Sequence, residues 1–258
     1  NGNIHLWQVS NGKEVSLFQG HSDWVRSVII SHDNSTLISA SSDQSIKIWD
    51  IATRQCVKTL KGHTNRVYSL AISADNQTIV SSSGDCTVKL WSIDTGECIK
   101  TFNGHIDRIW SISISPDGKT IISGSADQTV KQWDISTGEC LKTFKGHTAS
   151  ISSVTFSLDG GTVVSGSADK SIRLWNILTG ECLKIFNGHD RGVKSLVLNS
   201  ILFSSSSDGI IKIWNIQTGE CLKTLGEHTD IVRALAVNPD GNYLISCSDD
   251  QSIKLWDI

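Results

Sequence analysis

The sequence lacks several features that would mark particular classes of protein. It contains no methionine, only two prolines and only two tyrosines in 258 residues. Because even residue 1 is not Met, we expect the chain to be part of a longer protein. No apolar run reaches the roughly 18 to 20 residues of a membrane helix, and the N-terminus does not have the charged-then-apolar pattern of a signal peptide. We therefore expect a soluble globular protein with no membrane segment.

Neither positive nor negative charge is in large excess. The formal net charge is −3, and 19% of the residues are charged. This balance argues against the broad basic surface on which sequence-independent nucleic-acid binding depends. The charge balance makes nucleic acid an unfavoured partner and indicates no other.

Motifs for catalysis, cofactors and metals are missing. There is no phosphate-binding loop, no nucleophile elbow, no His-Glu-x-x-His zinc motif and no Cys-x-x-Cys pair. We expect no cofactor, no metal and no catalytic residue. Free thiols are expected in a reducing, cytoplasmic compartment, because five of the seven cysteines fill one repeated position, too far apart for disulfides. That position is occupied by Cys56, Cys98, Cys140, Cys182 and Cys221.

Tryptophan, by contrast, is abundant and periodic. Seven of the nine tryptophans are spaced by 42 residues, with a single interval of 39. A period of this length indicates one supersecondary unit repeated along the chain. The periodic residues are Trp7, Trp49, Trp91, Trp133, Trp175, Trp214 and Trp256.

Each unit reads as four short strands. Between residues 108 and 144, runs rich in Ile, Val, Thr and Trp alternate with the turn sequences Pro-Asp-Gly, Ala-Asp-Gln and Ser-Thr-Gly. No apolar stripe of helical period is present. We name the four strands a, b, c and d in chain order and predict an all-β protein.

The units resemble the WD40 repeat family along the whole chain. The resemblance rests on Gly-His near the start of a unit and Trp-Asp near its end, as in Gly104-His105 and Trp133-Asp134. It implies a β-propeller of four-stranded antiparallel blades around a channel, with strand a innermost. We expect one domain over residues 1–258, with a partial blade at 1–18 and blades at about 24–60, 66–102, 108–144, 150–186, 192–225 and 231–258.

The number of strands bears on how the ring closes. The pattern predicts six a, six b, seven c and six d strands, or 25 in all. Seven four-stranded blades would need three more strands, so a ring of seven positions with one gap is the favoured interpretation. A closed ring of six blades, which leaves one c strand over, is the second.

A His, Ser, Asp and Trp recur in six units, with 18 residues from His to Ser in five of them and 15 in the fifth. Ser, His and Asp could suggest hydrolysis, but a catalytic site is a single asymmetric pocket, and six copies favour a structural role. The family resemblance implies a buried hydrogen-bond network, and buried polar groups are costly unless fully partnered. The predicted sets are His21, Ser39, Asp43, Trp49; His63, Ser81, Asp85, Trp91; His105, Ser123, Asp127, Trp133; His147, Ser165, Asp169, Trp175; His189, Ser204, Asp208, Trp214; and His228, Ser246, Asp250, Trp256.

Eleven lysines and arginines also occupy repeated positions, on strands c and d. We interpret them as solvated charges of the outer strands, which would discourage edge pairing. They are Lys47, Lys89, Lys131, Arg173, Lys212 and Lys254 on strand c, and Lys58, Lys100, Lys142, Lys184 and Lys223 on strand d.

Positions at which the units differ are candidates for partner binding. In the WD40 family the channel mouth is lined by the third and fifth residues after the His and by the residue before the Asp. The first three units carry aromatic and basic residues there, the composition of binding hot spots. The predicted partner-binding residues are Trp24, Arg26, Arg66, Tyr68, Arg108, Trp110, Lys194, Arg233 and Asp249.

These observations favour a non-catalytic scaffold or ligand-sensing module that binds a protein or peptide, which an acidic or phosphorylated segment would suit. A nucleic-acid-binding propeller using the Arg and aromatic rim is one alternative, and a propeller enzyme is another. The amino-acid sequences of the units, such as TGECLKTFKGHT at residues 137–148 and its variants, are similar to those of the C-terminal propellers of bacterial STAND-type NTPases. That similarity implies a parent signalling protein with an NTPase domain. Fold alone does not specify function.

Overall fold

The computed structural model describes residues 2–238 and 240–258. This part of the chain forms 25 strands, the number that the repeat predicts, and has no helix. It accordingly contains no helix long and apolar enough to cross a membrane. The strands are β1 (Asn3–Gln8), β2 (Lys13–Gln19), β3 (Val25–Ile30), β4 (Thr36–Ser41), β5 (Ser45–Asp50), β6 (Cys56–Lys61), β7 (Val67–Ile72), β8 (Thr78–Ser83), β9 (Thr87–Ser92), β10 (Cys98–Asn103), β11 (Ile109–Ile114), β12 (Thr120–Ser125), β13 (Val130–Asp134), β14 (Cys140–Phe144), β15 (Ile151–Phe156), β16 (Thr162–Ser167), β17 (Ile172–Asn176), β18 (Cys182–Phe186), β19 (Val193–Leu198), β20 (Leu202–Ser206), β21 (Ile211–Trp214), β22 (Cys221–Leu225), β23 (Val232–Val237), β24 (Tyr243–Ser248) and β25 (Ile253–Asp257).

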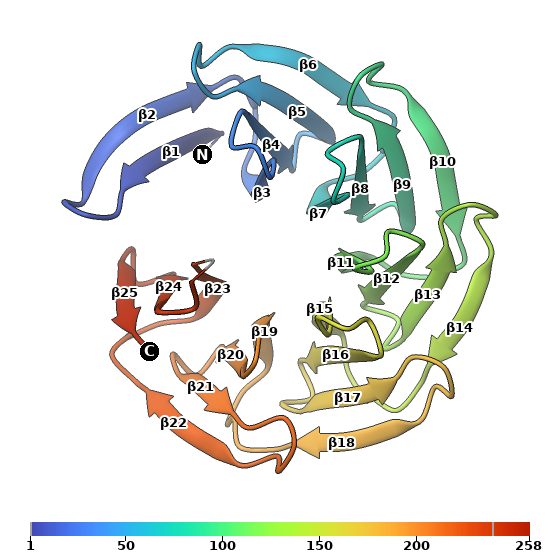
Figure 1. Cartoon of the computed structure of the whole chain (residues 1–258), viewed down its shortest axis with the longest axis vertical. Coiled ribbons are helices and arrows are strands. Elements are labelled where there is room, and N and C mark those ends of the chain that lie inside the picture. Colours follow the sequence, from blue (N-terminus) through green and yellow to red (C-terminus); the bar gives the residue numbers. More distant parts are fainter. Residues whose placement is uncertain (1, 239) are drawn as a thin grey trace.

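The strands form antiparallel sheets arranged as the blades of a β-propeller. Five sheets have four strands: β3–β6, β7–β10, β11–β14, β15–β18 and β19–β22. A sixth, β23–β25, has three strands, and β1 and β2 form a two-stranded sheet. Figure 1 shows the sheets standing around a central channel, with strand a of each blade innermost and strand d outermost.

The ring is open on one side. Figure 1 shows the opening between the β1–β2 sheet and the β23–β25 sheet, and these two sheets do not pair among the described residues. The structure thus has six blades and a two-stranded sheet. It does not support the expectation of seven blades, because the strands that would complete a seventh are not among those present. In the described part of the chain, N- and C-terminal strands do not combine in one blade.

Local turn chemistry ends each strand at a defined residue. In the β11–β12 turn, Asp117 accepts hydrogen bonds from the Ser115 hydroxyl and the Lys119 N–H, and Gly118 adopts a φ of 70°. In the β12–β13 turn, Gln128 has a φ of 70°. Side-chain oxygens that bind nearby backbone N–H groups stabilise such turns, and short side chains tolerate the left-handed region best. Similar turns recur in the other blades and set the strand register.

The hydrophobic core lies between neighbouring blades. One buried cluster joins Ile122, Val130 and Phe144 of the β11–β14 blade to Ile151 and Val154 of the next. The approach is so close that a Cβ on Gly124 would lie 2.7 Å from Ile151 Cγ2 and 2.8 Å from Val154 Cγ1. Each blade therefore depends on its neighbour for most of its apolar burial.

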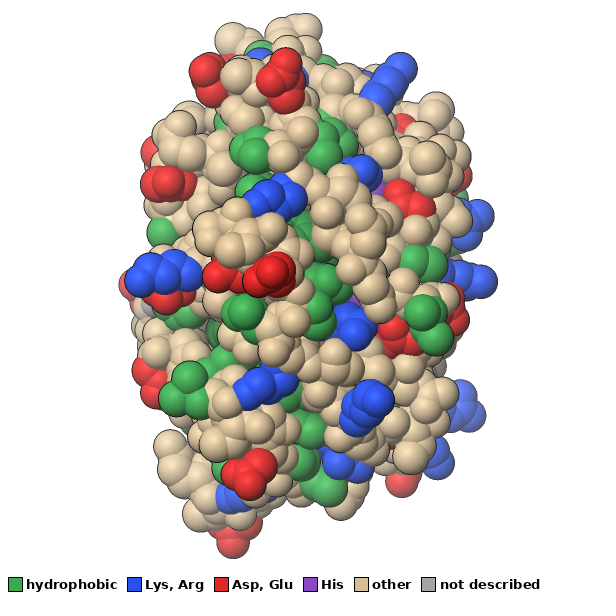
Figure 2. All heavy atoms as spheres, turned by 90° about the vertical axis from the view of Figure 1, so that its right-hand side faces the viewer, with side chains coloured by type: hydrophobic (Ala, Val, Ile, Leu, Met, Phe, Trp, Pro, Cys, Tyr) green, Lys and Arg blue, Asp and Glu red, His purple; other side chains and the backbone are tan. Residues whose placement is uncertain are grey.

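Strand-d lysines also join the blades, which corrects their interpretation as merely solvated charges. Lys58 Nζ donates a hydrogen bond of 2.9 Å to the Ile93 carbonyl in the next blade, and Lys100 Nζ donates one of 3.2 Å to Ile135. Lys142 and Lys184 reach the following blades in the same way. The error arose because the spacing within a unit does not show what lies across the gap between units. Figure 2 shows basic, acidic and apolar side chains intermixed on this outer wall.

Candidate functional site

The four residues of each predicted set come together in every one of the six blades. In the β11–β14 blade, His105 lies in the turn before strand a, Ser123 on β12, Asp127 in the following turn and Trp133 on β13. Trp133 Nε1 donates to Ser123 Oγ at 2.8 Å, and Ser123 Oγ lies 2.7 Å from His105 Nε2. His105 Nδ1 lies 2.6 Å from Asp127 Oδ2. The chain of contacts joins two strands, β13 and β12, to two turns.

The same geometry recurs with little variation. The distance from His Nδ1 to Asp Oδ2 spans 2.6 to 3.1 Å, and that from His Nε2 to Ser Oγ spans 2.7 to 2.8 Å. The Trp-to-Ser hydrogen bond measures 2.8 Å in all six sets. The repeat thus places an equivalent polar network in each blade.

Two further groups complete each network and were not singled out from the sequence. The backbone N–H after the His donates to the Asp, as Thr64 does to Asp85 at 3.0 Å. A hydroxyl two residues after the Asp also donates to it, as Thr129 does to Asp127 at 2.6 Å. The column of Ser45, Thr87, Thr129, Ser171 and Ser252 could have been noticed from its constant spacing. Ile210 replaces the hydroxyl in the β19–β22 blade, where the His-to-Asp distance is longest at 3.1 Å.

Burial and hydrogen bonding shift the pKa values of Asp43 and His21 in the network of the first blade. Burial alone would raise the pKa of Asp43, but hydrogen bonds from Ser45, His21 and backbone N–H groups lower it to about 2. Burial lowers the pKa of His21 below its usual 6.5, and the hydrogen bond with Asp43 offsets this only in part. An ionised Asp and a neutral His follow. Nδ1–H then donates to the carboxylate, and Nε2 accepts from the Ser hydroxyl.

The Asp–His–Ser hydrogen bonds resemble those of a hydrolytic triad, but the serine is not accessible to a substrate. Ser123 is fully buried, and its oxygen already accepts the Trp133 N–H while donating to His105. A nucleophile must reach its substrate, and this oxygen has no open approach. The geometry suits a structural tie between strands.

The predicted rim positions are brought together by backbone hydrogen bonds. The N–H of the residue before the network Asp donates to the carbonyl of the third residue after the His, as Ala126 does to Arg108 at 2.8 Å. The same bond, at 2.8 to 3.0 Å, pairs Ser42 with Trp24, Gly84 with Arg66, Ala168 with Ser150, Ser207 with Gly192 and Asp249 with Ile231. Each blade therefore places these two rim positions next to each other.

On the first blade, an exposed tryptophan is ordered by an arginine. Trp24 is 59% exposed, and the Arg26 guanidinium carbon lies 5.0 Å from its ring centroid. Arg26 Nε also donates to Ser42 Oγ at 2.7 Å. A cation held over an aromatic face and hydrogen-bonded at the same time has less freedom to lose on binding.

The next two blades share an aromatic pair. The rings of Tyr68 and Trp110 lie 4.4 Å apart, centroid to centroid, with an interplanar angle of 43°. Both side chains are half-buried, whereas Arg66 and Arg108, at the ends of the adjoining turns, are exposed. An exposed arginine thus precedes each ring of this tilted pair by two residues.

On the last two blades, the charged rim residues are paired with or close to one another. Arg233 binds Asp249 through both carboxylate oxygens, with Nε at 2.9 and 3.0 Å. Burial lowers the pKa of the neighbouring Lys194, as does the charge of Arg233, while Asp249 raises it. Because Asp249 neutralises Arg233, this side offers less free positive charge than the first three blades.

Metal-binding groups are not assembled among the described residues: no group of three or more His, Cys, Asp or Glu side chains could hold an ion. All seven cysteines are free thiols, and the five in the repeated strand-d position are exposed.

Comparison with known proteins agrees with this geometry. The family model described as WD domain, G-beta repeat matches residues 12–50, 54–92, 96–134, 138–176, 180–215 and 219–257. No curated protein matches the chain significantly. The six matches cover most of the sequence, and each spans strand d of one sheet and strands a to c of the next. The chain therefore belongs to the WD40 repeat family.

Proposed function

We propose that the chain is a non-catalytic interaction module that binds a protein or peptide partner on the rim of its first three blades. WD40 propellers are typically scaffolds for protein interactions. The observation that carries the proposal is the pair of ordered aromatic groups, Trp24 with Arg26 and Tyr68 with Trp110, beside two exposed arginines. Preordered aromatic and Arg side chains bind with little loss of side-chain entropy.

The partner segment is proposed to be acidic or phosphorylated. Arg26, Arg66 and Arg108 lie on consecutive blades, and guanidinium groups bind carboxylate and phosphate oxygens in a bidentate way. The tilted pair of rings would hold the apolar part of the same segment. Lys194, Arg233 and Asp249 would contribute less, because Asp249 already binds Arg233.

The test is capture of a partner from native extract by the intact protein and by a variant with Trp24, Arg66, Arg108 and Trp110 all replaced by Ala. We expect the partner to be retained by the first and lost by the second. The control replaces Ser150 and Ser152, which occupy the equivalent positions of the β15–β18 blade, and should retain the partner. Equal capture by the quadruple variant and the control would remove the rim as the binding site.

Salt dependence separates this proposal from nucleic-acid binding. If single-stranded RNA or DNA bound the rim, its affinity would fall steeply and log-linearly with salt as phosphate counterions were released. A peptide with one or two charged contacts should show a much shallower slope. A steep slope together with competition by oligonucleotide would favour the nucleic-acid alternative.

Three broader features belong to the same proposal. The chain would be a single propeller domain, with the β1–β2 sheet occupying a seventh position of the ring. It would work in the cytoplasm, where free thiols are stable. The similarity of its repeats to those of STAND-type NTPases supports a role as the sensor of a larger signalling protein.

A further inference from the structure

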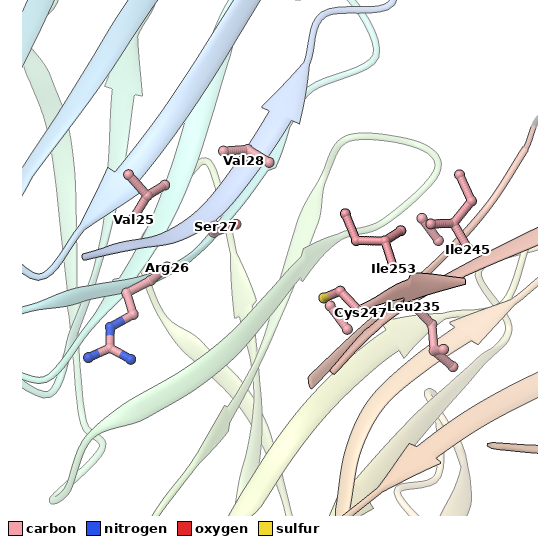
Figure 3. A pocket seen from close by; sticks show the side chains of 10 residues that line it. Val25, Arg26, Ser27, Val28, Leu235, Ile245, Cys247 and Ile253 are labelled. Carbon is pink, nitrogen blue, oxygen red and sulfur yellow. The ribbon is translucent and has the colours of Figure 1, made fainter. Parts of the chain in front are cut away.

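Two hollows in the surface differ in the chemistry of their lining. The larger has a volume of about 450 Å³ and lies between β3 and the last blade, and Figure 3 shows Val25, Val28 and Ile253 among its mainly apolar side chains. The smaller has a volume of about 270 Å³ and lies on the β11–β14 blade, and we call it the lysine notch. Its lining includes Ile106, Asp127, Thr129, Lys131, Thr143 and Lys145.

The lysine notch lies where the loop from β10 to β11 passes the outer strands of its blade. Ile106 belongs to this loop, Lys131 lies on β13 and Thr143 on β14. Lys145 follows β14 directly. β13 and β14 are strands c and d, whereas the rim residue Trp110 lies on strand a. The notch is therefore a separate site, and the inference below does not depend on the rim.

The cations of the notch are held in place without being neutralised. Lys131 Nζ donates a hydrogen bond of 2.9 Å to Thr143 Oγ1. An ammonium group has three protons, so Lys131 keeps two for a ligand, and the Thr143 hydroxyl keeps its own proton to donate. Among residues 2–238 and 240–258, neither Lys131 nor Lys145 forms a salt bridge.

One carboxylate also lines the notch, but donors already occupy its oxygens. Asp127 Oδ2 lies 2.6 Å from His105 Nδ1 and accepts the Ile106 N–H at 3.2 Å. Asp127 Oδ1 accepts the N–H and the hydroxyl of Thr129, at 2.9 and 2.6 Å. The side chain of Asp127 is 4% exposed. Two lysines against one buried carboxylate leave the notch positively charged, which favours an anionic ligand.

The paired lysines are repeated in one other blade, which provides a comparison. In the β3–β6 blade, Lys47 Nζ donates to Thr59 Oγ1 at 2.9 Å, and Lys61 occupies the position of Lys145. The remaining complete blades have no lysine at that position, which is filled by Asn103, Asn187 and Gly226.

Ile106 gives the lysine notch an apolar wall that the β3–β6 blade lacks. It is 88% exposed, so its side chain is free to contact a ligand. A ligand that joins an anion to an apolar group would therefore contact the lysines and the isoleucine at once. The other five units have a polar residue at this position, namely Ser22, Thr64, Thr148, Asp190 and Thr229.

We propose that the lysine notch binds a phosphorylated serine or threonine within a polypeptide segment, with an adjacent apolar residue packed on Ile106. At pH 7 such a group carries a charge of about −1.5 to −2 and has three acceptor oxygens, which two ammonium groups and a hydroxyl can match. Lysine binds phosphate as a point charge, whereas a planar carboxylate is best matched by the fork of arginine. The volume of about 270 Å³ leaves room beside a phosphate group for part of the adjacent side chain.

The probes are two blocked dipeptides, N-acetyl-phosphoseryl-leucine amide and its glycine counterpart, with inorganic phosphate as the reference. With ¹⁵N-labelled protein at constant ionic strength, we expect the leucine dipeptide to shift the amide signals of Ile106, Thr143 and Lys145 with a Kd below about 5 mM. The glycine dipeptide and inorganic phosphate should each bind at least about threefold more weakly, because they lack the apolar contact. Binding should weaken severalfold from about pH 7.5 to about pH 5, because the phosphate gains its second proton near pH 6.

Variants of the protein locate the site. Lys145→Ala should weaken binding of the leucine dipeptide at least about fivefold, because a charge-assisted contact is lost. Ile106→Ser copies the residue of the β3–β6 blade and should remove the preference for leucine over glycine. The matched control is Lys61→Ala, which should bind normally. Lys145, Ile106 and Lys61 are exposed, and thermal denaturation checks that each variant is folded.

Three results would overturn the proposal. One is the absence of a saturable shift up to about 10 mM leucine dipeptide. Another is equal weakening by Lys61→Ala and Lys145→Ala, because the phosphate would then bind surface lysines in general. The third is equal affinity for inorganic phosphate and the leucine dipeptide, because the notch would then bind the free ion rather than a phosphorylated segment.

Discussion

The network aspartate accepts more hydrogen bonds than any other residue of its set. Asp127 receives the His105 imidazole, the Thr129 hydroxyl and the N–H groups of Ile106 and Thr129, at 2.6 to 3.2 Å. Its side chain is 4% exposed. These bonds connect the turn before strand a to the turn between b and c, so a single carboxylate holds two loops in place.

Replacing this carboxylate should destabilise the protein. We expect Asp127→Ala to lower the free energy of unfolding by about 2 to 3 kcal/mol, because buried donors lose their acceptor. Urea denaturation measures the change. Asp94→Ala, in an exposed turn, is the control and should shift the midpoint little. An unchanged midpoint for Asp127→Ala would contradict the structural role of the network.

The network should also make stability dependent on pH. The folded-state pKa values of His21, His147 and His189 lie below 6.5, so the unfolded chain binds protons more tightly. Stability should be complete above about pH 6.5 and decline as the pH falls below it. A second decline should follow below about pH 4, because Asp43 and Asp169 have a folded pKa of about 2. Urea midpoints that rise from about pH 7 to about pH 5 would be inconsistent with this assignment.

At the scale of the strand and turn, a lysine and a glycine from adjacent blades form a repeated pair. The aliphatic part of the strand-d lysine passes over the glycine of the next c–d turn, and its ammonium group reaches a carbonyl of that turn. A Cβ on Gly180 would lie 2.9 Å from Lys142 Cδ, and one on Gly138 would lie 3.1 Å from Lys100 Cδ. The Thr-Gly of the turn and the Lys of strand d therefore recur together for a physical reason.

Two glycine variants separate the contact from the backbone effect. Gly180 and Gly118 have φ values of 80° and 70°, but a Cβ on Gly118 would meet nothing within 4 Å. Gly118→Ala should cost about 1 kcal/mol through the left-handed backbone alone. Gly180→Ala should cost about 1 kcal/mol more, because Lys142 must move and loses its hydrogen bond. Equal losses in thermal denaturation would show that the lysine contact contributes nothing.

Over the whole molecule, apolar burial depends on having a blade on each side. Val130 on β13 is fully buried between blades, whereas the corresponding Ile253 on β25 is 63% exposed. Within residues 2–238 and 240–258, the last sheet has three strands, a to c, and one neighbouring blade. Stability should therefore decrease toward the open side of the ring.

Hydrogen exchange should show this gradient. We expect amides of β25 to exchange at least about tenfold faster than those of β13, because β25 pairs on one edge only and its core contacts are fewer. Mass spectrometry of fragments covering residues 250–258 and 128–136 compares equivalent strands. Equal rates in the isolated protein would mean that the ring unfolds as one unit despite its opening.

The strands and the polar network of each blade could be predicted from the sequence, because the same spacing of residues recurs in each unit. The spacing of Trp133, Asp127 and Ser123 is a local property, set by strand alternation and turn length. It was enough to predict 25 strands, an all-β propeller and which four residues of each unit would be grouped. The hydroxyl column that includes Thr129 was equally regular, and was missed only because Thr and Ser are common at strand starts.

Contacts between units were decided by the tertiary structure. The rings of Tyr68 and Trp110 pack against each other although they belong to different units, and Lys100 binds a carbonyl of a unit that follows it. Such contacts depend on how neighbouring blades twist and approach, which the spacing within a unit does not specify. The sequence by itself determined the blade and the number of strands, and only the packing of blade against blade decided the contacts between units and the arrangement of the rim.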